Sequence, residues 1–392
     1  MLQSTALKSE FLLDPSVTFL NFGSFGACPR PVFERYQRYQ LELETEPVQF
    51  IAFKGTAYLE ASRKVLGTYL NCDKDDLVYV TNPSYAVNIV AKGLNLQAGD
   101  EVLTSDLEYG ACDKTWAYYC EKSGARLVRQ KINLPLRSKE QFLEDVFSGV
   151  SERTRVIFLS HITSTTALVF PVAEVCALAR KRGILTFIDG AHAPGQIPLD
   201  LGALDADIYT GACHKWMLAP KGCSFFYAKK EVQHYFDPLV VSWGYNSSTP
   251  SASRFIDYHQ NQGTRDFSAF LCTAAAIDFM NRHNWTEVAA QCRALVRRNA
   301  ARFATLLNTQ LLCEAESDFL AQMLSLEIQT KTPELLQAHL YNHYKIEIPV
   351  MRHGNRCYIR FSVNAFNSQH DLDRLYQALS EIKHAKKLMD QV

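Results

Sequence analysis

The sequence predicts an α/β protein with a large domain, built on a mostly parallel seven-stranded sheet between helices, and a small α+β C-terminal domain. Between Leu77 and Tyr227, short apolar segments alternate with amphipathic, helix-like segments. Strands buried on both faces are apolar throughout, so this alternation indicates a sheet covered on both sides. After Thr264 the pattern becomes helical and ends in a strand–helix–strand tail. A chain of 392 residues is long enough for about two domains.

Short apolar segments place the individual elements. Seven strands are predicted at Leu77–Val80, Glu101–Thr104, Arg126–Gln130, Arg155–Ser160, Ile184–Asp189, Ile208–Thr210 and Ser224–Tyr227. Helices are predicted between several of them, including Ser84–Gly93 and Val172–Arg182, and then at Phe267–Arg282 and Trp285–Leu307. The tail is predicted as Met323–Gln329, Pro333–His343, Tyr358–Ser362 and Asp371–Lys387. These elements predict a large domain at 21–265, followed by linking helices and the small domain at 266–392.

Composition restricts the class of protein and its partners. Lysine plus arginine and aspartate plus glutamate both number 41, so the net charge is zero, which argues against nucleic acid or an anionic membrane as the main partner. No apolar run approaches the roughly 20 residues of a membrane-spanning helix, and no metal site is predicted. The eleven cysteines show no CxxC spacing, and the polar first residues lack the core of a signal peptide. We therefore expect free thiols and a cytoplasmic location.

Lys215 is the first candidate for chemistry. It follows the apolar segment Ile208–Thr210, has apolar neighbours, and precedes a Pro-x-Gly turn. A lysine in apolar surroundings has a lowered pKa and becomes an amine nucleophile, which forms Schiff bases with aldehyde cofactors such as pyridoxal phosphate (PLP). Taken alone, the His-Lys pair favours the simpler interpretation, a surface lysine in a turn.

Asp189 is the second candidate. It ends the apolar strand Ile184–Asp189, and side chains at the carboxyl ends of strands point into the ligand crevice of an open α/β sheet. A PLP enzyme needs a carboxylate there to pair with the protonated pyridine nitrogen. Asp189 alone could also be a helix cap or a turn residue.

Together, Asp-x-x-His at 189–192, His-Lys-Trp at 214–216 and Pro-x-Gly at 220–222 resemble the class V aminotransferase family of fold-type I PLP-dependent enzymes. The resemblance extends from about Phe19 to Tyr376, and the family includes cysteine desulfurases, cysteine C–S lyases and isopenicillin N epimerase. It implies the fold-type I transferase fold, PLP as cofactor, Lys215 as Schiff-base lysine and general base, and Asp189 on the ring nitrogen. It also implies that the first 20 residues pack near the small domain.

The family's phosphate site maps onto a predicted helix start. Ser84 and Tyr85 match the family's Thr and Glu there, and helix N-termini suit phosphate groups. An N-cap role for Ser84 explains the residue equally well. His214 matches the family histidine near the phosphate, whereas Ala212 replaces the serine of many members, so one phosphate contact is missing or supplied elsewhere.

Three residues match positions around the cofactor ring. Tyr109 matches the residue stacked on the ring, which is histidine in most desulfurases and tyrosine in the epimerase-like branch. Ser164 takes the place of the asparagine on the ring hydroxyl, where Thr163 or a water could substitute. His192 takes the place of a desulfurase glutamine and is a candidate catalytic residue. A core tyrosine and a structural histidine are the alternatives.

Further matches concern the substrate and a second subunit. Thr264, in the Gly-Thr-Arg-Asp motif of the epimerase-like branch, implies a homodimer in which it reaches the partner's phosphate; a solvated turn is the alternative. Arg360, inside an apolar strand, implies binding of the substrate α-carboxylate, although an edge-strand arginine facing water would fit too. Asn21 and Ser24 resemble the segment at the substrate entrance.

These residues predict PLP chemistry at the α-carbon of a small amino acid. The resemblance favours an isopenicillin N epimerase-like enzyme, while the residues fit a cysteine or cysteine-conjugate C–S lyase equally well, and an aminotransferase is a further possibility. Epimerisation needs a second acid/base, for which Tyr109 or His192 would have to serve. A PLP-binding protein without catalysis is less compatible with the presence of Lys215, Asp189 and Arg360 together.

A persulfide-forming desulfurase is not expected. Such enzymes carry a catalytic cysteine on a mobile loop before the substrate arginine, and Lys345 stands at the corresponding position. The nearest cysteine, Cys357, lies within a strand pattern just before Arg360. We therefore expect Cys357 to have only a packing role.

Overall fold

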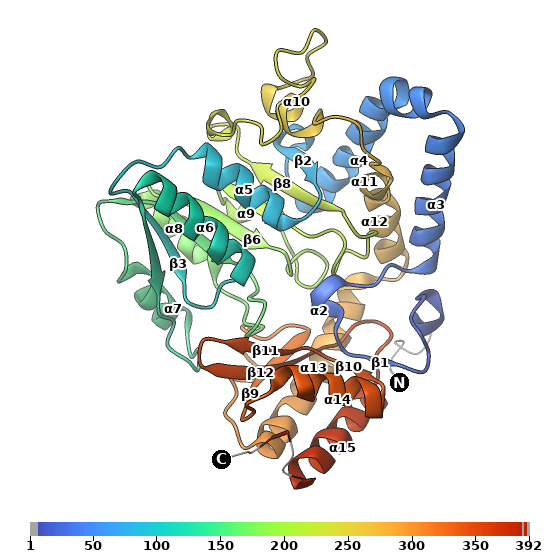
Figure 1. The fold of residues 1–392 in the computed structure, drawn as a ribbon, viewed down its shortest axis with the longest axis vertical. Helices are drawn as coiled ribbons and strands as arrows, with labels where there is room; N and C mark the ends of the chain where they lie inside the picture. Colours follow the sequence, from blue (N-terminus) through green and yellow to red (C-terminus); the bar gives the residue numbers. More distant parts are fainter. Residues whose placement is uncertain (1–6, 386–387, 390–392) are drawn as a thin grey trace.

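The computed structural model describes residues 7–385 and 388–389. A large part contains the main sheet, and a smaller part contains the C-terminal helices and a second sheet, at the bottom of Figure 1. Within the described residues, no helix combines the length and apolar character needed to cross a membrane.

The main sheet has seven strands in the order β2-β8-β7-β6-β5-β3-β4. Only β8 runs against its neighbours, so the predicted mostly parallel seven-stranded sheet is confirmed. The predicted strands differ from the observed ones by one residue at most at either end. The observed bounds are β2 Leu77–Val80, β3 Glu101–Ser105, β4 Arg126–Gln130, β5 Thr154–Ser160, β6 Leu185–Gly190, β7 Ile208–Gly211 and β8 Ser224–Ala228.

Each face of this sheet has its own hydrophobic core, because successive side chains of a strand point to opposite faces. On β6, Phe187 belongs to one core and Ile188 to the other. The first core includes side chains of α5 (Pro83–Gly93) and α6 (Gly110–Ser123); the second includes those of α4 (Gly55–Leu70), α8 (Val172–Lys181) and α12 (Thr273–Arg282). The sheet is therefore the middle of three layers, as its apolar strands predicted.

The strand order reverses between β3 and β5. From β3 the chain passes through α6 to β4 on one side, and from β5 it passes through α8 to β6 on the other. In open α/β sheets, ligands bind outside the carboxyl ends of the strands at such a reversal. The loops that follow β3, β5, β6 and β7 are therefore the expected walls of a site.

The smaller part is built on an antiparallel three-stranded sheet in the order β11-β12-β9. The chain enters it through the long helix α13 (Trp285–Leu307), predicted with the same bounds. Its other elements are β9 Met323–Ile328, α14 Pro333–Tyr344, β11 Val350–His353, β12 Arg356–Ser362 and α15 Gln369–Ala385. Residues 386–387, predicted as the end of the last helix, lie outside the described residues.

The N-terminal segment contacts this smaller part. Strand β1 (Thr18–Phe19) pairs in parallel with β10 (Ile346–Glu347), and the Leu20 amide donates to the Glu347 carbonyl. Residues 1–6 of the predicted N-terminal segment lie outside the described residues. The predicted domain boundaries at residues 20 and 265 stay a prediction.

Some elements differ from the sequence prediction or were not predicted. The helix predicted at Phe267–Arg282 is two helices, α11 (Ser268–Leu271) and α12, because Cys272 adopts φ −76° and ψ −8°, a tight-turn geometry that interrupts regular helix. The remaining elements are η1 Lys8–Glu10, α2 Phe22–Phe25, α3 Arg30–Thr45, η2 Gln49–Lys54, η3 Lys74–Asp76, α7 Lys139–Phe147, α9 Leu201–Leu204, η4 Gln233–Tyr235 and α10 Arg254–Gln260.

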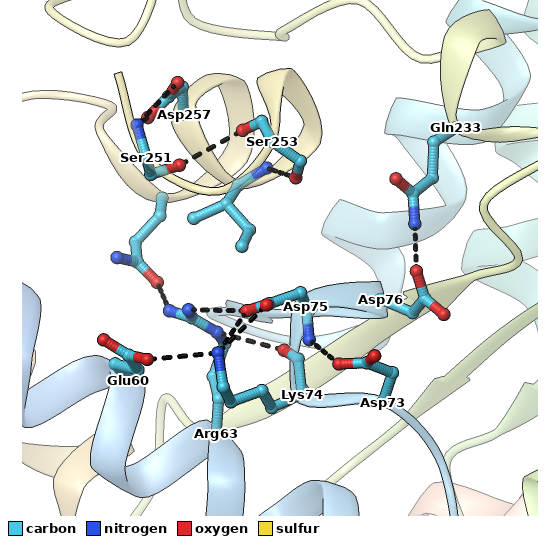
Figure 2. A network of polar contacts seen from close by, with 12 residues as sticks. Glu60, Arg63, Asp73, Lys74, Asp75, Asp76, Gln233, Ser251, Ser253 and Asp257 are labelled. Carbon is cyan, nitrogen blue, oxygen red and sulfur yellow. Dashed lines mark hydrogen bonds and ion pairs between the residues drawn. The ribbon is translucent and has the colours of Figure 1, made fainter. Parts of the chain in front are cut away.

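A polar network anchors α10, which leads into the segment carrying Thr264 (Figure 2). The buried Arg63 of α4 donates to the Gln260 side chain at the end of α10 and to the Lys74 carbonyl, and it lies 3.6 Å from Asp75. At the start of α10, the Ser253 hydroxyl caps the helix, and the Ser251 amide donates to a carboxylate of the first turn. The arginine thereby ties α4 and the turn before β2 to α10.

We expect Arg63→Ala to destabilise the protein by about 2–4 kcal/mol, because Gln260 and the Lys74 carbonyl would lose their buried donor. The matched control is Arg282→Ala, which removes only an exposed i,i+4 pair with Asp278 and should cost less than about 0.5 kcal/mol. Thermal and denaturant unfolding midpoints check the difference. Equal shifts for the two variants would contradict the structural role of Arg63.

Candidate active site

A cavity of about 270 Å³ opens at the carboxyl end of the main sheet. Its walls come from α2, the start of α5, and the loops after β3, β5, β6 and β7. The lining residues are Ser24, Phe25, Asn82, Pro83, Ser84, Tyr109, Cys112, Ser160, Ile162, Ser164, Asp189, Ala191, His192, His214 and Lys215. Most of the candidates that the sequence singled out are therefore brought together here.

Lys215 lies in the turn that follows β7. Gly26 packs against this turn with φ +66°, and a Cβ at Gly26 would come within 2.8 Å of the Lys215 Cα. Burial, and next the positive charge of Arg360, lower the pKa of Lys215 to about 8. A neutral, nucleophilic amine is therefore available close to neutral pH.

Asp189, at the end of β6, is a buried carboxyl group. Its Oδ1 accepts a hydrogen bond from the Ala191 amide (2.9 Å), and its Oδ2 lies 3.5 Å from the Cys112 sulfur. Burial raises the pKa of Asp189 from its ordinary value. Because burying a carboxylate without a cation is costly, the group favours a positively charged partner in the cavity.

Arg360 lies behind the part of the wall formed by Ser24 and Ser164. Its side chain is 1% exposed, and burial lowers its pKa to about 10. Its guanidinium donates to the Ser164 carbonyl and hydroxyl and to the Ser24 hydroxyl, while its Nε has no hydrogen-bond partner in the part of the chain that the structure describes. Within the described residues no acidic side chain forms an ion pair with it, so this buried cation favours an anionic ligand.

The N-terminus of α5 forms one end of the cavity. Asn82, rather than Ser84, caps this helix: its side chain accepts from the Tyr85 amide at 2.9 Å.

His214 has its Nδ1 2.8 Å from the Cys223 carbonyl, so Nδ1 carries a proton and Nε2 of the neutral ring is unprotonated. Burial lowers the pKa of His214 to about 4, and a bound phosphate dianion would favour the charged form instead.

The loop after β3 carries Tyr109, which is 49% exposed at the cavity mouth. Its neighbour Glu108 is buried; it accepts from the Ser160 amide (2.9 Å) and from the Ser105 hydroxyl (2.6 Å). Burial raises the pKa of Glu108 to about 7. These bonds tie the loop to the end of β5, across the reversal of strand order, and so fix the backbone that presents Tyr109.

Four predicted site residues do not line this cavity: Arg360, which lies behind its wall, and Tyr85, Thr264 and Asn21. The Tyr85 hydroxyl donates to the Gln262 side chain (3.0 Å). Thr264 is exposed and does not belong to the cavity lining. Asn21 does not reach the cavity itself: its side-chain oxygen accepts a hydrogen bond from the hydroxyl of Ser24, which does line it. Their predicted contacts with cofactor, partner or substrate stay predictions.

The structure brings three further side chains, which the sequence interpretation passed over, to the cavity or against residues that line it. Glu108 and Trp216 are immediate neighbours of the candidates Tyr109 and Lys215, and Cys112 lies one helical turn further on in α6. Glu108 could have been found from the sequence, because it is an acidic residue directly beside Tyr109, the candidate ring contact. Nothing in the sequence signals that Cys112 faces Asp189.

These groups fit pyridoxal phosphate. Lys215 would supply an amine of lowered pKa, Asp189 a buried carboxylate for the ring nitrogen, and the α5 N-terminus with Ser84 a phosphate site. The uncompensated Arg360 suits the carboxylate of an amino acid. The fold and the site together define a PLP-dependent enzyme of fold-type I.

Comparison with known proteins agrees with this class. The family model Aminotransferase class-V matches residues 26–375. The chain is 33% identical to isopenicillin N epimerase of Amycolatopsis lactamdurans over 96% of its own length and 97% of the relative's, and 27% identical to L-cysteine desulfhydrase of Arabidopsis thaliana over 97% and 91%. The structure of a cysteine desulfurase from Thermococcus onnurineus superimposes with a TM-score of 0.83 at 20% identity, covering 97% of this chain and 98% of that one.

The chain belongs to the class V aminotransferase family. The resemblance stated from its motifs is thereby confirmed, as are the fold, the enzymatic nature of the protein and pyridoxal phosphate as its cofactor.

Proposed function

We propose that this enzyme removes the α-proton of an amino acid whose carboxylate is bound by Arg360. The observation that carries this proposal is the buried guanidinium itself: it is 1% exposed, has an unpartnered Nε, and contacts Ser24 and Ser164 on the wall of the cavity that contains Lys215. A buried cation of this kind is costly unless an anion completes it. An α-carboxylate supplies that anion and orients the α-carbon.

The residues then divide the chemistry between them. PLP, when bound, supplies the electron sink that makes the α-proton acidic. Asp189 would hold the ring nitrogen in its charged form, and Tyr109, at the cavity mouth, would supply an aromatic face for the ring. Lys215 would hold the cofactor through Nζ, and its free amine would accept the α-proton, because a pKa of about 8 suits a base near neutral pH.

Isopenicillin N epimerase-like chemistry is the first candidate for the overall reaction, supported by relatives that are 32% and 33% identical over 96% of the chain. Elimination from cysteine or a cysteine conjugate is the second. Lys215 is the one lysine among the lining residues, and β-elimination needs only this base and a leaving group on the substrate. The lining therefore favours elimination. L-Cysteine desulfhydrases, 27% identical, support it as well.

A persulfide on Cys357 is not part of the proposal. Cys357 and Arg360 are an odd number of positions apart on β12, so their side chains point to opposite faces of the strand. The buried Cys357 sulfur lies 3.6 Å from the Thr330 carbonyl. Cys357→Ala is therefore a suitable control with unchanged turnover.

The experiment is incubation of the holoenzyme with L- and D-amino acids in deuterated water. We expect deuterium at the α-position, because proton removal is common to both candidates. Inversion of configuration identifies an epimerase, whereas pyruvate, ammonia and sulfide identify a C–S lyase. Absence of both exchange and product with every amino acid, by a protein loaded with PLP, would overturn the proposal.

We further propose that the enzyme is a homodimer in which Thr264 reaches the phosphate bound by the partner subunit. Thr264 lies in an exposed segment, beside a loop that presents Val241 (68% exposed), Trp243 (86%) and Tyr245. Exposed apolar side chains clustered in this way mark protein–protein contacts. If this loop contacts a second copy of the chain, Thr264 beside it would lie at the contact between the two subunits.

A complementation experiment tests this arrangement. Thr264→Val and Lys215→Ala should each be inactive at limiting cofactor, and co-expression of the two should restore about a quarter of wild-type activity, since half of the dimers are mixed and each contains one intact site. No recovery would mean that Thr264 acts within its own subunit. An active monomer in analytical ultracentrifugation would contradict the dimer itself.

The location proposed is the cytoplasm. All eleven cysteines are free thiols, which supports a reducing compartment.

A further inference from the structure

His192 has an unusually defined environment. The side chain is 3% exposed, and its two ring nitrogens face different partners: Nε2 lies 3.3 Å from the Lys215 amine, and Nδ1 lies 3.3 Å from the indole nitrogen of Trp216. Its main-chain carbonyl accepts from the Gln196 side chain at 2.7 Å. Both the ring and its backbone are therefore held.

The indole contact determines where the imidazole proton resides. An indole N–H can only donate, so Nδ1 must accept and Nε2 must carry the proton of the neutral ring. Protonation would place a hydrogen on Nδ1 as well, opposite the indole N–H. Burial, followed by the charges of Lys215, Arg360 and His214, independently lowers the pKa of His192 well below its ordinary value.

Trp216 is itself held rigidly. A Cβ at Gly195, which has φ +84°, would collide with the Trp216 main chain, so the two backbones are in close contact. The indole ring packs on Phe22 with ring centroids 5.0 Å apart. Gln196 also accepts from the Gln322 amide (2.9 Å), which ties the His192 loop to the chain before β9. The direction of the indole N–H is therefore fixed by packing on several sides.

We propose that Trp216 is a positioning residue that locks His192 as a neutral Nε2–H hydrogen-bond donor aimed at Lys215. This inference rests on the proposed role of Lys215 as the attachment point and base. A ring locked in this way donates to the lysine nitrogen when that amine is neutral, or to acceptor atoms of the cofactor beside it, and it does not exchange protons with substrate. His192 is thereby removed from the two candidates for a second acid/base, and only Tyr109 is left.

The first test uses the cofactor-free protein and needs no activity. In protein labelled with ¹⁵N-histidine, His192 should show a protonated Nε2 and an unprotonated Nδ1 above the Lys215 pKa of about 8, where the amine is neutral and can accept. It should not take up a second proton between about pH 5 and 8, where ordinary histidines titrate. The signal is assigned by its absence in His192→Gln. Trp216→Phe keeps an aromatic ring but removes the donor, so it should bring in the other tautomer. A wild-type His192 protonated on Nδ1 where Lys215 is neutral, or one that takes up a second proton near neutral pH, would overturn the inference even if Trp216→Phe does not fold.

The second test is rescue by a side chain that donates but does not exchange protons. His192→Leu should lower kcat/KM roughly tenfold, the effect of losing one buried hydrogen bond, and glutamine at the same position should restore most of that loss. If His192 transfers protons instead, the glutamine and leucine variants should be equally impaired, by about 10²–10⁴-fold. Because the tautomer is measured without substrate, its outcome stands whether or not the proposed function survives.

Discussion

Arg360→Gln is expected to weaken amino-acid binding by about 2–5 kcal/mol, or roughly 30- to 5,000-fold, while PLP still binds. The guanidinium is buried and has no acidic partner in the described residues, so its interaction with a carboxylate takes place away from water. Glutamine keeps hydrogen-bonding capacity but not the charge. Spectral titration of the holoenzyme with amino acids, beside a cofactor titration of the apoenzyme, separates the two affinities.

The matched control is Arg352→Gln on the neighbouring strand β11. Arg352 is exposed and donates to the Lys331 carbonyl, away from the cavity, so the same substitution there should leave amino-acid binding unchanged. Equal loss of PLP and amino-acid affinity in Arg360→Gln would mean that the arginine maintains the fold of the site. Unchanged binding of both would remove Arg360 from the substrate site.

The main sheet was predictable because its strands are buried on both faces. An apolar segment such as Leu77–Val80 or Ile208–Gly211 needs no knowledge of its neighbours to be recognised. The pairing of β1 with β10 was not predictable: each strand has two residues, and the contact joins distant parts of the chain. The break at Cys272 was not predictable either, since no glycine or proline marks it.

In the site, sequence alone identifies residue types at strand ends, but not their neighbours. Asp189 and Lys215 follow from that logic. That Arg360 has no acidic partner among the residues the structure describes is a property of the folded arrangement, and so is the contact of Trp216 with His192. The cap of α5 could have been predicted, because Asn82 followed by Pro83 is a typical helix start, which leaves the Ser84 hydroxyl available to a ligand.

Lys215→Arg is expected to abolish covalent capture of PLP and to lower turnover by about 10²–10⁴-fold, because arginine supplies neither the nucleophile nor the base. Borohydride reduction of the wild-type holoenzyme followed by peptide mapping should label Lys215. Lys221, the next lysine along the chain, is the matched control: Lys221→Arg should still be labelled at Lys215. Label on any other lysine refutes the assignment.

The lowered pKa of Lys215 gives this prediction a pH dependence. Only the neutral amine attacks an aldehyde, so the rate of PLP capture by the apoenzyme should rise as pH rises toward about 8 and level off above it. An ordinary lysine, with a pKa of roughly 10.4, would show a rate still rising well beyond pH 8. Because the charge of Arg360 helps to lower this pKa, Arg360→Gln should move the plateau to higher pH. A plateau that stays in place in that variant would mean that burial alone sets the pKa, and that the arginine exerts no significant field at the lysine.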